Sequence, residues 1–132
     1  YRANVSARRL EKLEAPGPLR DKVAAFYDGI IAFAQGEGRL LGCLMTNSTV
    51  ELAPHDRDTR LAVAANIGAM EAAFRRVLTR AKKNGELAPD KSPTDLARFF
   101  TATANGLNVL AKVNPERAVL RSVVRTALQV LD

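Results

Sequence analysis

The sequence predicts an all-α fold in which six helices form one domain that spans residues 1–132. Apolar residues recur at helical spacing along most of the chain, and no segment shows the alternation of apolar and polar residues that marks a strand. Proline, glycine and capping residues separate the apolar stretches. The chain has 132 residues, of which 47% are hydrophobic, and this is enough for a single buried core.

The first predicted helix covers residues 1–14, with Ala3, Ala7, Leu10 and Leu13 on one face. It ends at residues 16–18, Pro-Gly-Pro, where prolines block its continuation. Pro18 then suits the first turn of a second helix, since its missing N–H would have no partner there. That helix carries one apolar stripe, formed by Leu19, Val23, Phe26, Ile30 and Phe33, and ends at Gly36 and Gly38.

The stretch 36–54 gathers glycines, the single cysteine, a methionine and amide side chains between two apolar helices. Residues 43–53 are predicted to form a short third helix, and its apolar residues point to several sides. Asp56 is the predicted N-cap of a fourth helix over residues 57–84, and Gly85 is the predicted left-handed residue after it. The fourth helix has a stripe formed by Val63, Ile67, Met70, Phe74, Val77, Leu78 and Ala81.

The last two helices are predicted over residues 93–113 and from Pro115 to Leu131. The motif Ser-Pro-Thr-Asp at residues 92–95 resembles a capping box. Apolar residues cover more than half of the fifth helix, whose polar arc holds only Arg98, Thr101, Asn105, Asn108 and Lys112. About half of the sixth helix is also apolar.

Such wide apolar faces need two partners, which we take to be the domain's own core and the same helix pair of a second subunit. We therefore expect a homodimer that forms through a four-helix bundle. Helices that are central in a monomer are the alternative. The predicted interface residues are Phe100, Gly106, Leu107, Leu110, Leu120, Val124, Ala127, Leu128 and Leu131.

The charge and cysteine content narrow the class of protein. The chain has 20 Lys and Arg against 14 Asp and Glu, a formal charge of +6, and its basic residues are spread among acidic ones. This pattern favours solvated faces over direct DNA binding, which would cluster them. No apolar run approaches the roughly 20 residues of a membrane span. One cysteine excludes an internal disulfide and suits the cytoplasm, where we expect the protein to reside.

Catalytic and metal-binding residues are not predicted. The only histidine, His55, lies at a helix start and offers no nucleophile–base pair. Cys43 and His55 alone cannot form a metal site, and we expect neither an enzyme nor a cofactor. Cys43 is interpreted either as a thiol sensor or as a small packed residue without a resolving cysteine.

A pocket is favoured by polar side chains that lie at or beside apolar faces. Thr103 is predicted at the centre of the apolar arc of its helix, where its hydroxyl either bonds back to the carbonyl of Phe99 or lines a pocket. Together with Tyr27, Asn47 and Asn66 it would supply the few polar anchors of a mostly apolar small-molecule site.

Two motifs and the helices that follow them carry a family resemblance. Residues 42–47, Gly-Cys-Leu-Met-Thr-Asn, and residues 51–56, Glu-Leu-Ala-Pro-His-Asp, precede a long helix, and Gly85-Glu-Leu follows it. Asp95-Leu-Ala, Phe99-Phe100 and Gly106-Leu107 continue the pattern. The chain resembles the C-terminal regulatory domain of the TetR family of bacterial transcriptional repressors.

The resemblance implies a helix-turn-helix domain before residue 1, with residues 1–14 as the remainder of the connecting helix. It implies dimerisation through the last two helices, and contact with operator DNA only through the preceding domain. It also implies a cavity for a small effector among the second to fifth helices. The predicted lining residues are Phe26, Tyr27, Ile30, Met45, Asn47, Asn66, Met70, Phe74, Phe99 and Thr103.

In the predicted mechanism, an effector that fits only the wrong spacing of the two DNA-reading heads releases the operator. The alternatives on the same scaffold are a thiol or electrophile sensor that acts through Cys43, and a helical dimerisation scaffold without a ligand.

Overall fold

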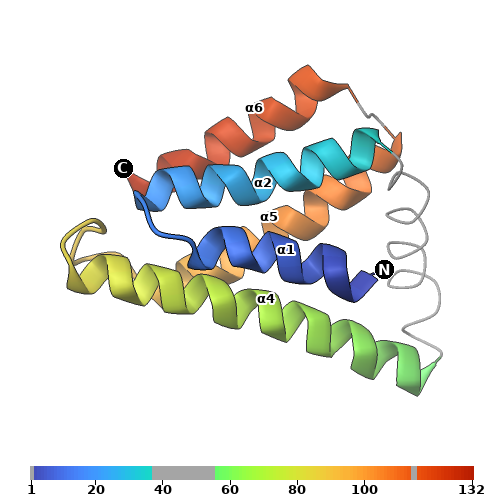
Figure 1. Ribbon diagram of the computed structural model, residues 1–132, viewed down its shortest axis with the longest axis horizontal. Helices are drawn as coiled ribbons and strands as arrows, with labels where there is room; N and C mark the ends of the chain where they lie inside the picture. Colours follow the sequence, from blue (N-terminus) through green and yellow to red (C-terminus); the bar gives the residue numbers. More distant parts are fainter. Residues whose placement is uncertain (1, 37–55, 114–115) are drawn as a thin grey trace.

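The computed structural model describes residues 2–36, 56–113 and 116–132, and these residues form helices and no strands (Figure 1). The predicted all-α class is confirmed. The elements are α1 (Arg2–Glu14), α2 (Leu19–Gln35), α4 (Arg57–Lys83), α5 (Pro93–Val113), α6 (Arg117–Leu128) and the short 3-10 helix η2 (Gln129–Leu131). The third helix predicted over residues 43–53 lies outside the described residues.

Local signals place the helix ends close to the predicted positions. Asp56 caps α4, because its carboxylate accepts hydrogen bonds from the Asp58 N–H at 3.1 Å and the Thr59 hydroxyl at 2.5 Å. These bonds, foremost the one from Thr59, hold the pKa of Asp56 below its usual value. Gly85 after α4 has a φ of 86°, the left-handed conformation predicted for it. In α5, the Asp95 N–H donates to the Ser92 hydroxyl at 3.1 Å, as in a capping box.

Helix α2 is central in the molecule and packs against α1, α5 and α6 (Figure 1). Helix α4 lies along one side, where it packs against α5 and α1. A hydrogen bond joins the start of α2 to the segment that follows α4: the Leu19 N–H donates to the Glu86 carboxylate at 2.8 Å. At the far end of α1, Arg76 donates to Glu14 at 3.0 Å.

Helix α5 turns a different side to the core from the predicted one. Its buried residues are Ala97, Phe100, Thr101, Ala104, Leu107 and Ala111. Thr101 was predicted on the polar arc and is buried instead, whereas Phe99 is 41% exposed. The apolar arc was too wide to define an inward side. The buried side has alanines at every seventh position, 97, 104 and 111, which let α5 approach its neighbours closely.

Most of the residues predicted for the dimer interface are buried within a single chain. Phe100, Leu107 and Leu120 have at most 1% of their surface exposed within a single chain, because they fill its own core. Val124, Ala127 and Leu128 are buried there as well. Gly106 is exposed, and Leu110 and Leu131 are half-buried. These last three are the predicted interface residues that are not buried in a single chain, and the interface itself stays a prediction.

Candidate functional site

Four aromatic rings form the centre of the core. Phe26 and Tyr27 of α2 contact Phe74 of α4, with ring centroids 4.9 Å apart for Phe26 and 6.3 Å for Tyr27. Phe74 stacks on Phe100 of α5 at 5.4 Å. The Tyr27 hydroxyl donates to the Phe100 carbonyl at 2.6 Å, and burial raises the pKa of this phenol. The rings fill the space between them and tie α2, α4 and α5 together.

Several of the predicted pocket residues therefore meet in the fold. Phe26, Tyr27 and Phe74 contact one another, and Ile30 is buried in the same core. Met70, one turn before Phe74, is half-buried and packs against this core. These side chains define the inner end of any site in this region.

The apolar stripe of α4 is covered along only half of its length. Its buried residues are Ala73, Phe74, Val77, Leu78 and Ala81, all in the second half of the helix. In the first half, from Arg57 to Met70, no side chain is buried. Val63 is half-buried, and Ile67 is 36% exposed although it continues the same stripe. An apolar surface thus extends outward from the aromatic cluster along α4.

Three other predicted pocket residues, Asn66, Phe99 and Thr103, are not part of the buried aromatic cluster. Asn66 is exposed on α4. Phe99 is on the surface of α5, and half-buried Thr103 donates its hydroxyl to the Phe99 carbonyl at 2.9 Å, the local bond that was the alternative to a pocket role. Met45, Asn47 and the proposed sensor Cys43 lie outside the described residues.

Thr101 is a buried polar residue that the sequence interpretation missed. Its side chain is 4% exposed, and its hydroxyl has no hydrogen-bond partner among the described residues. The Thr101 carbonyl accepts from the Asn105 side chain at 3.0 Å, so only the hydroxyl is unsatisfied. The composition of α5 carried no signal for this burial, because Thr101 shares its arc with residues that are charged or amide-bearing.

A second missed feature is a pair of cations on α1, which we call the α1 cation pair and which consists of Arg9 and Lys12. The Arg9 guanidinium lies over the ring of Phe33 of α2, 4.9 Å from its centroid. The Lys12 Nζ lies beside Gly29, only 2.8 Å from the position that a Cβ there would occupy. The spacing of Arg9 and Lys12 was visible in the sequence, but their position against α2 was not.

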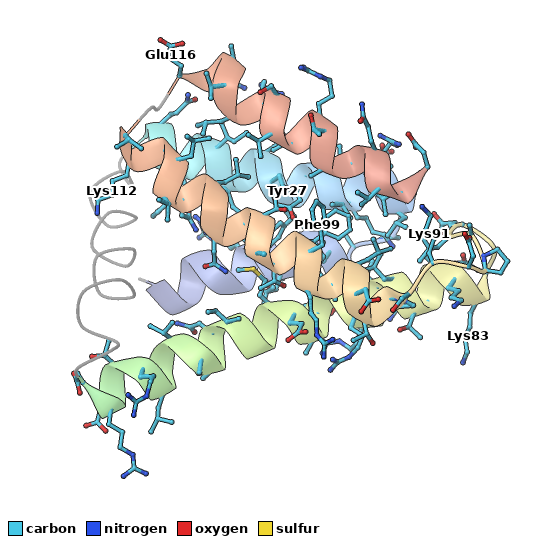
Figure 2. The ribbon with its side chains drawn as sticks, turned by 180° about the vertical axis from the view of Figure 1, so that it is seen from behind. Tyr27, Lys83, Lys91, Phe99, Lys112 and Glu116 are labelled. Atoms are coloured by element: carbon cyan, nitrogen blue, oxygen red, sulfur yellow. The ribbon has the colours of Figure 1, made fainter. Side chains whose placement is uncertain are left out.

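Helices α5 and α6 lie side by side on one face of the molecule (Figure 2). Three large apolar side chains of α5 are exposed: Phe99 to 41%, Val109 to 46% and Val113 to 80%. Gly106 lies between them along the helix, and a Cβ added there would meet no atom within 4 Å. We call these four residues the α5 surface stripe.

Comparison with known proteins matches residues 14–127 to the family described as "Tetracyclin repressor-like, C-terminal domain". The chain is also 33% identical over 134 residues to the "Uncharacterized HTH-type transcriptional regulator YezE" of Bacillus subtilis (strain 168), a match that covers 100% of this chain and 69% of that protein. The chain belongs to the TetR family. It corresponds to the C-terminal domain of a transcriptional regulator, which confirms the family predicted from the sequence. No solved structure matches the chain.

Within this TetR-family domain, the described residues contain no group of three or more His, Cys, Asp or Glu side chains that could hold a metal ion. None of the helices described in the structure is both long enough and apolar enough to cross a membrane.

Proposed function

We propose that this TetR-family domain binds a small, mostly apolar effector against the first half of α4. In the full-length, cytoplasmic dimer, effector binding would release operator DNA from the helix-turn-helix domains. The observation that supports this most directly is the division of α4, whose apolar stripe is buried after Ala73 and accessible before it.

An apolar effector would cover the part of the stripe that the described helices leave open. Val63, Ile67 and Met70 continue the line of Phe74 at helical spacing, so a ligand that lies along them ends against the aromatic cluster. Burial of apolar surface contributes roughly 25 cal/mol per Å² to binding, which makes even part of this stripe a useful contact for a small molecule. The polar anchors required for orientation would come from the surrounding helices.

The domain would form its homodimer through α5 and α6. The α5 surface stripe is apolar, and α6, which packs against α5, carries the half-buried valines Val119 and Val123. Gly106 in the middle of the stripe allows two helices to approach closely, which offsets its cost of about 1 kcal/mol relative to alanine in a helix. A symmetric pairing of this face on itself would cover all of these side chains at once.

Helix α1 would transmit the effect of the ligand. It contacts both α2 and α4, and the Glu14–Arg76 ion pair joins its last turn to the middle of α4. In the full-length protein the connecting helix would lead to DNA-reading heads that must lie about 34 Å apart in the dimer. A coupling of about 1–3 kcal/mol between the effector and the operator is typical of such systems.

The effector site can be tested with phenylnaphthylamine, an uncharged apolar dye whose fluorescence rises on burial. Titration of the 132-residue chain should show saturable binding, and Met70→Trp should weaken this binding at least about tenfold, because the larger ring occupies the stripe. Ala69→Trp is the matched control, since Ala69 is exposed on the same helix. Absence of saturable binding, or equal effects of the two variants, would contradict the proposed site.

A further inference from the structure

We infer that the effector carries an anionic group, and that the α1 cation pair, Arg9 and Lys12, binds this group over Gly29 and Phe33 of α2. The inference rests on the proposed function, because it names the chemical class of the effector. It concerns a region that none of the predicted lining residues occupies.

Arg9 has unused hydrogen-bonding capacity. Arg9 is half-buried, its guanidinium carbon lies over the Phe33 ring, and within the described residues it makes no ion pair. A guanidinium has five N–H donors, and its contact with the face of an aromatic ring does not use them as hydrogen-bond donors to a carboxylate or phosphate. Burial lowers the pKa of Arg9, as expected where the charge loses water without gaining an anion. A negatively charged group that accepts hydrogen bonds from the Arg9 N–H groups would compensate for this loss of water.

Lys12 adds a second positive charge one turn along the same helix. Its ammonium group rests against Gly29, where the missing side chain of the glycine leaves room on the surface of α2. Lys12 likewise has no carboxylate partner in the described chain. Two like charges that are close together and unpaired repel each other, and an anion bound between them would remove this repulsion.

Within the described residues, none of the acidic residues nearby in sequence forms an ion pair with Arg9 or Lys12. Glu14 pairs with Arg76 at 3.0 Å, and Asp28 lies 3.8 Å from Arg121 of α6. Glu11 is exposed on α1. Within the described residues the α1 cation pair therefore has no carboxylate partner, and a carboxylate, sulfonate or phosphate of a small molecule would match its charge.

The position of the pair agrees with an apolar body on α4. Helices α2 and α4 run in opposite directions (Figure 1). Residues after Phe26 in α2 and residues before Phe74 in α4 therefore extend from the aromatic cluster toward the same end of the molecule. Phe33 and the open part of the α4 stripe are such residues, so one ligand could contact both.

A matched pair of dyes tests the anionic group. Anilinonaphthalene sulfonate and phenylnaphthylamine share one aromatic body, but only the first carries a charge. The 132-residue chain should bind the sulfonate more tightly, and Arg9→Gln should weaken sulfonate binding about tenfold or more while it leaves binding of the uncharged dye unchanged. Arg9→Lys should restore part of the affinity, because it keeps the charge but not the stacked guanidinium.

Two controls separate a specific site from general charge and from misfolding. Arg8→Gln removes the same charge from an exposed neighbour and should leave both affinities unchanged. Gly29→Ala should displace the Lys12 ammonium and weaken sulfonate binding several-fold with no loss of thermal stability, since alanine favours the helix. Melting temperatures of all variants identify any that are unfolded.

The outcomes distinguish the two proposals. If both dyes bind equally and Arg9→Gln changes neither, the anionic group is refuted while the apolar site remains. If Arg8→Gln weakens the sulfonate as much as Arg9→Gln, the attraction is general and the specific site is refuted. If neither dye binds, both the effector site and the anionic group fail.

Discussion

At the scale of single residues, two hydroxyl groups in the core behave differently. The Tyr27 hydroxyl is buried but donates to the Phe100 carbonyl at 2.6 Å, so its burial is compensated. The Thr101 hydroxyl is equally inaccessible and has no partner among the described residues. A buried polar group without a hydrogen bond costs roughly 1–3 kcal/mol in proteins.

Thr101→Val should therefore raise the free energy of unfolding by about 1 kcal/mol, because it removes the unpaired hydroxyl and conserves the shape of the side chain. Urea denaturation of the two proteins measures this change. Thr103→Val serves as the control and should give no gain, since the Thr103 hydroxyl donates to the Phe99 carbonyl at 2.9 Å. A loss of stability in Thr101→Val would mean that the hydroxyl serves the native state.

At the scale of the helix, the sequence pattern shows which residues are apolar, and packing decides which of them are buried. The pattern of α5 allowed several orientations, and the alanines at 97, 104 and 111 decide which one packs best. Each is buried to at least 95%, and their small side chains allow close contact with the neighbouring helices. Helix α4 shows the opposite case, in which the predicted stripe is correct but only its second half is buried.

Ala104→Leu should destabilise the domain by about 1–3 kcal/mol, because the added methylene groups have no space between α5 and the core. Ala102→Leu makes the same change at an exposed position of the same helix and should alter stability by about 0.5 kcal/mol or less. Thermal unfolding followed by circular dichroism measures both. Similar melting temperatures for the two variants would show that the described orientation of α5 does not hold.

At the scale of the whole molecule, the α5 surface stripe is the apolar face on which the proposed dimer depends. Phe99, Val109 and Val113 are exposed on α5, and the neighbouring α6 carries the half-buried Val119 and Val123. The core residues first assigned to the interface, such as Phe100 and Leu120, support these helices from within. The proposed dimer therefore depends on the outer row of side chains.

Val109→Glu should convert the proposed dimer into single chains, because it would bury charges in the middle of the interface. Light scattering coupled to gel filtration should give a mass near twice 14.3 kDa for the unmodified chain and near 14.3 kDa for the variant. Leu61→Glu is the matched control, as Leu61 is 55% exposed on α4, and it should leave the mass unchanged. A single-chain mass for the unmodified protein would contradict dimerisation through this face.

Much of the fold could be predicted from the sequence, and less of the candidate site. Helical spacing placed Phe26 and Phe74 on the apolar stripes of their helices, and the resemblance assigned them with Tyr27 to one cavity. The structure joins the three rings in one cluster. Arg9 and Thr101 were not predicted, since their importance depends on which atoms of other helices lie beside them. The assignments of Met45, Asn47 and Cys43 stay predictions.

The sequence alone determined the all-α class and the positions of the helix ends, because periodicity, caps and breakers act over only a few residues. The family followed from the resemblance carried by its motifs. Asp56, Gly85 and Ser92 each act at the predicted place. Only the tertiary structure decided which side of α5 is buried, at which residue the burial of the α4 stripe begins, and which residues lie beside Arg9. These features depend on contacts between helices that are far apart in the chain, and a helix with a wide apolar surface is compatible with more than one of them.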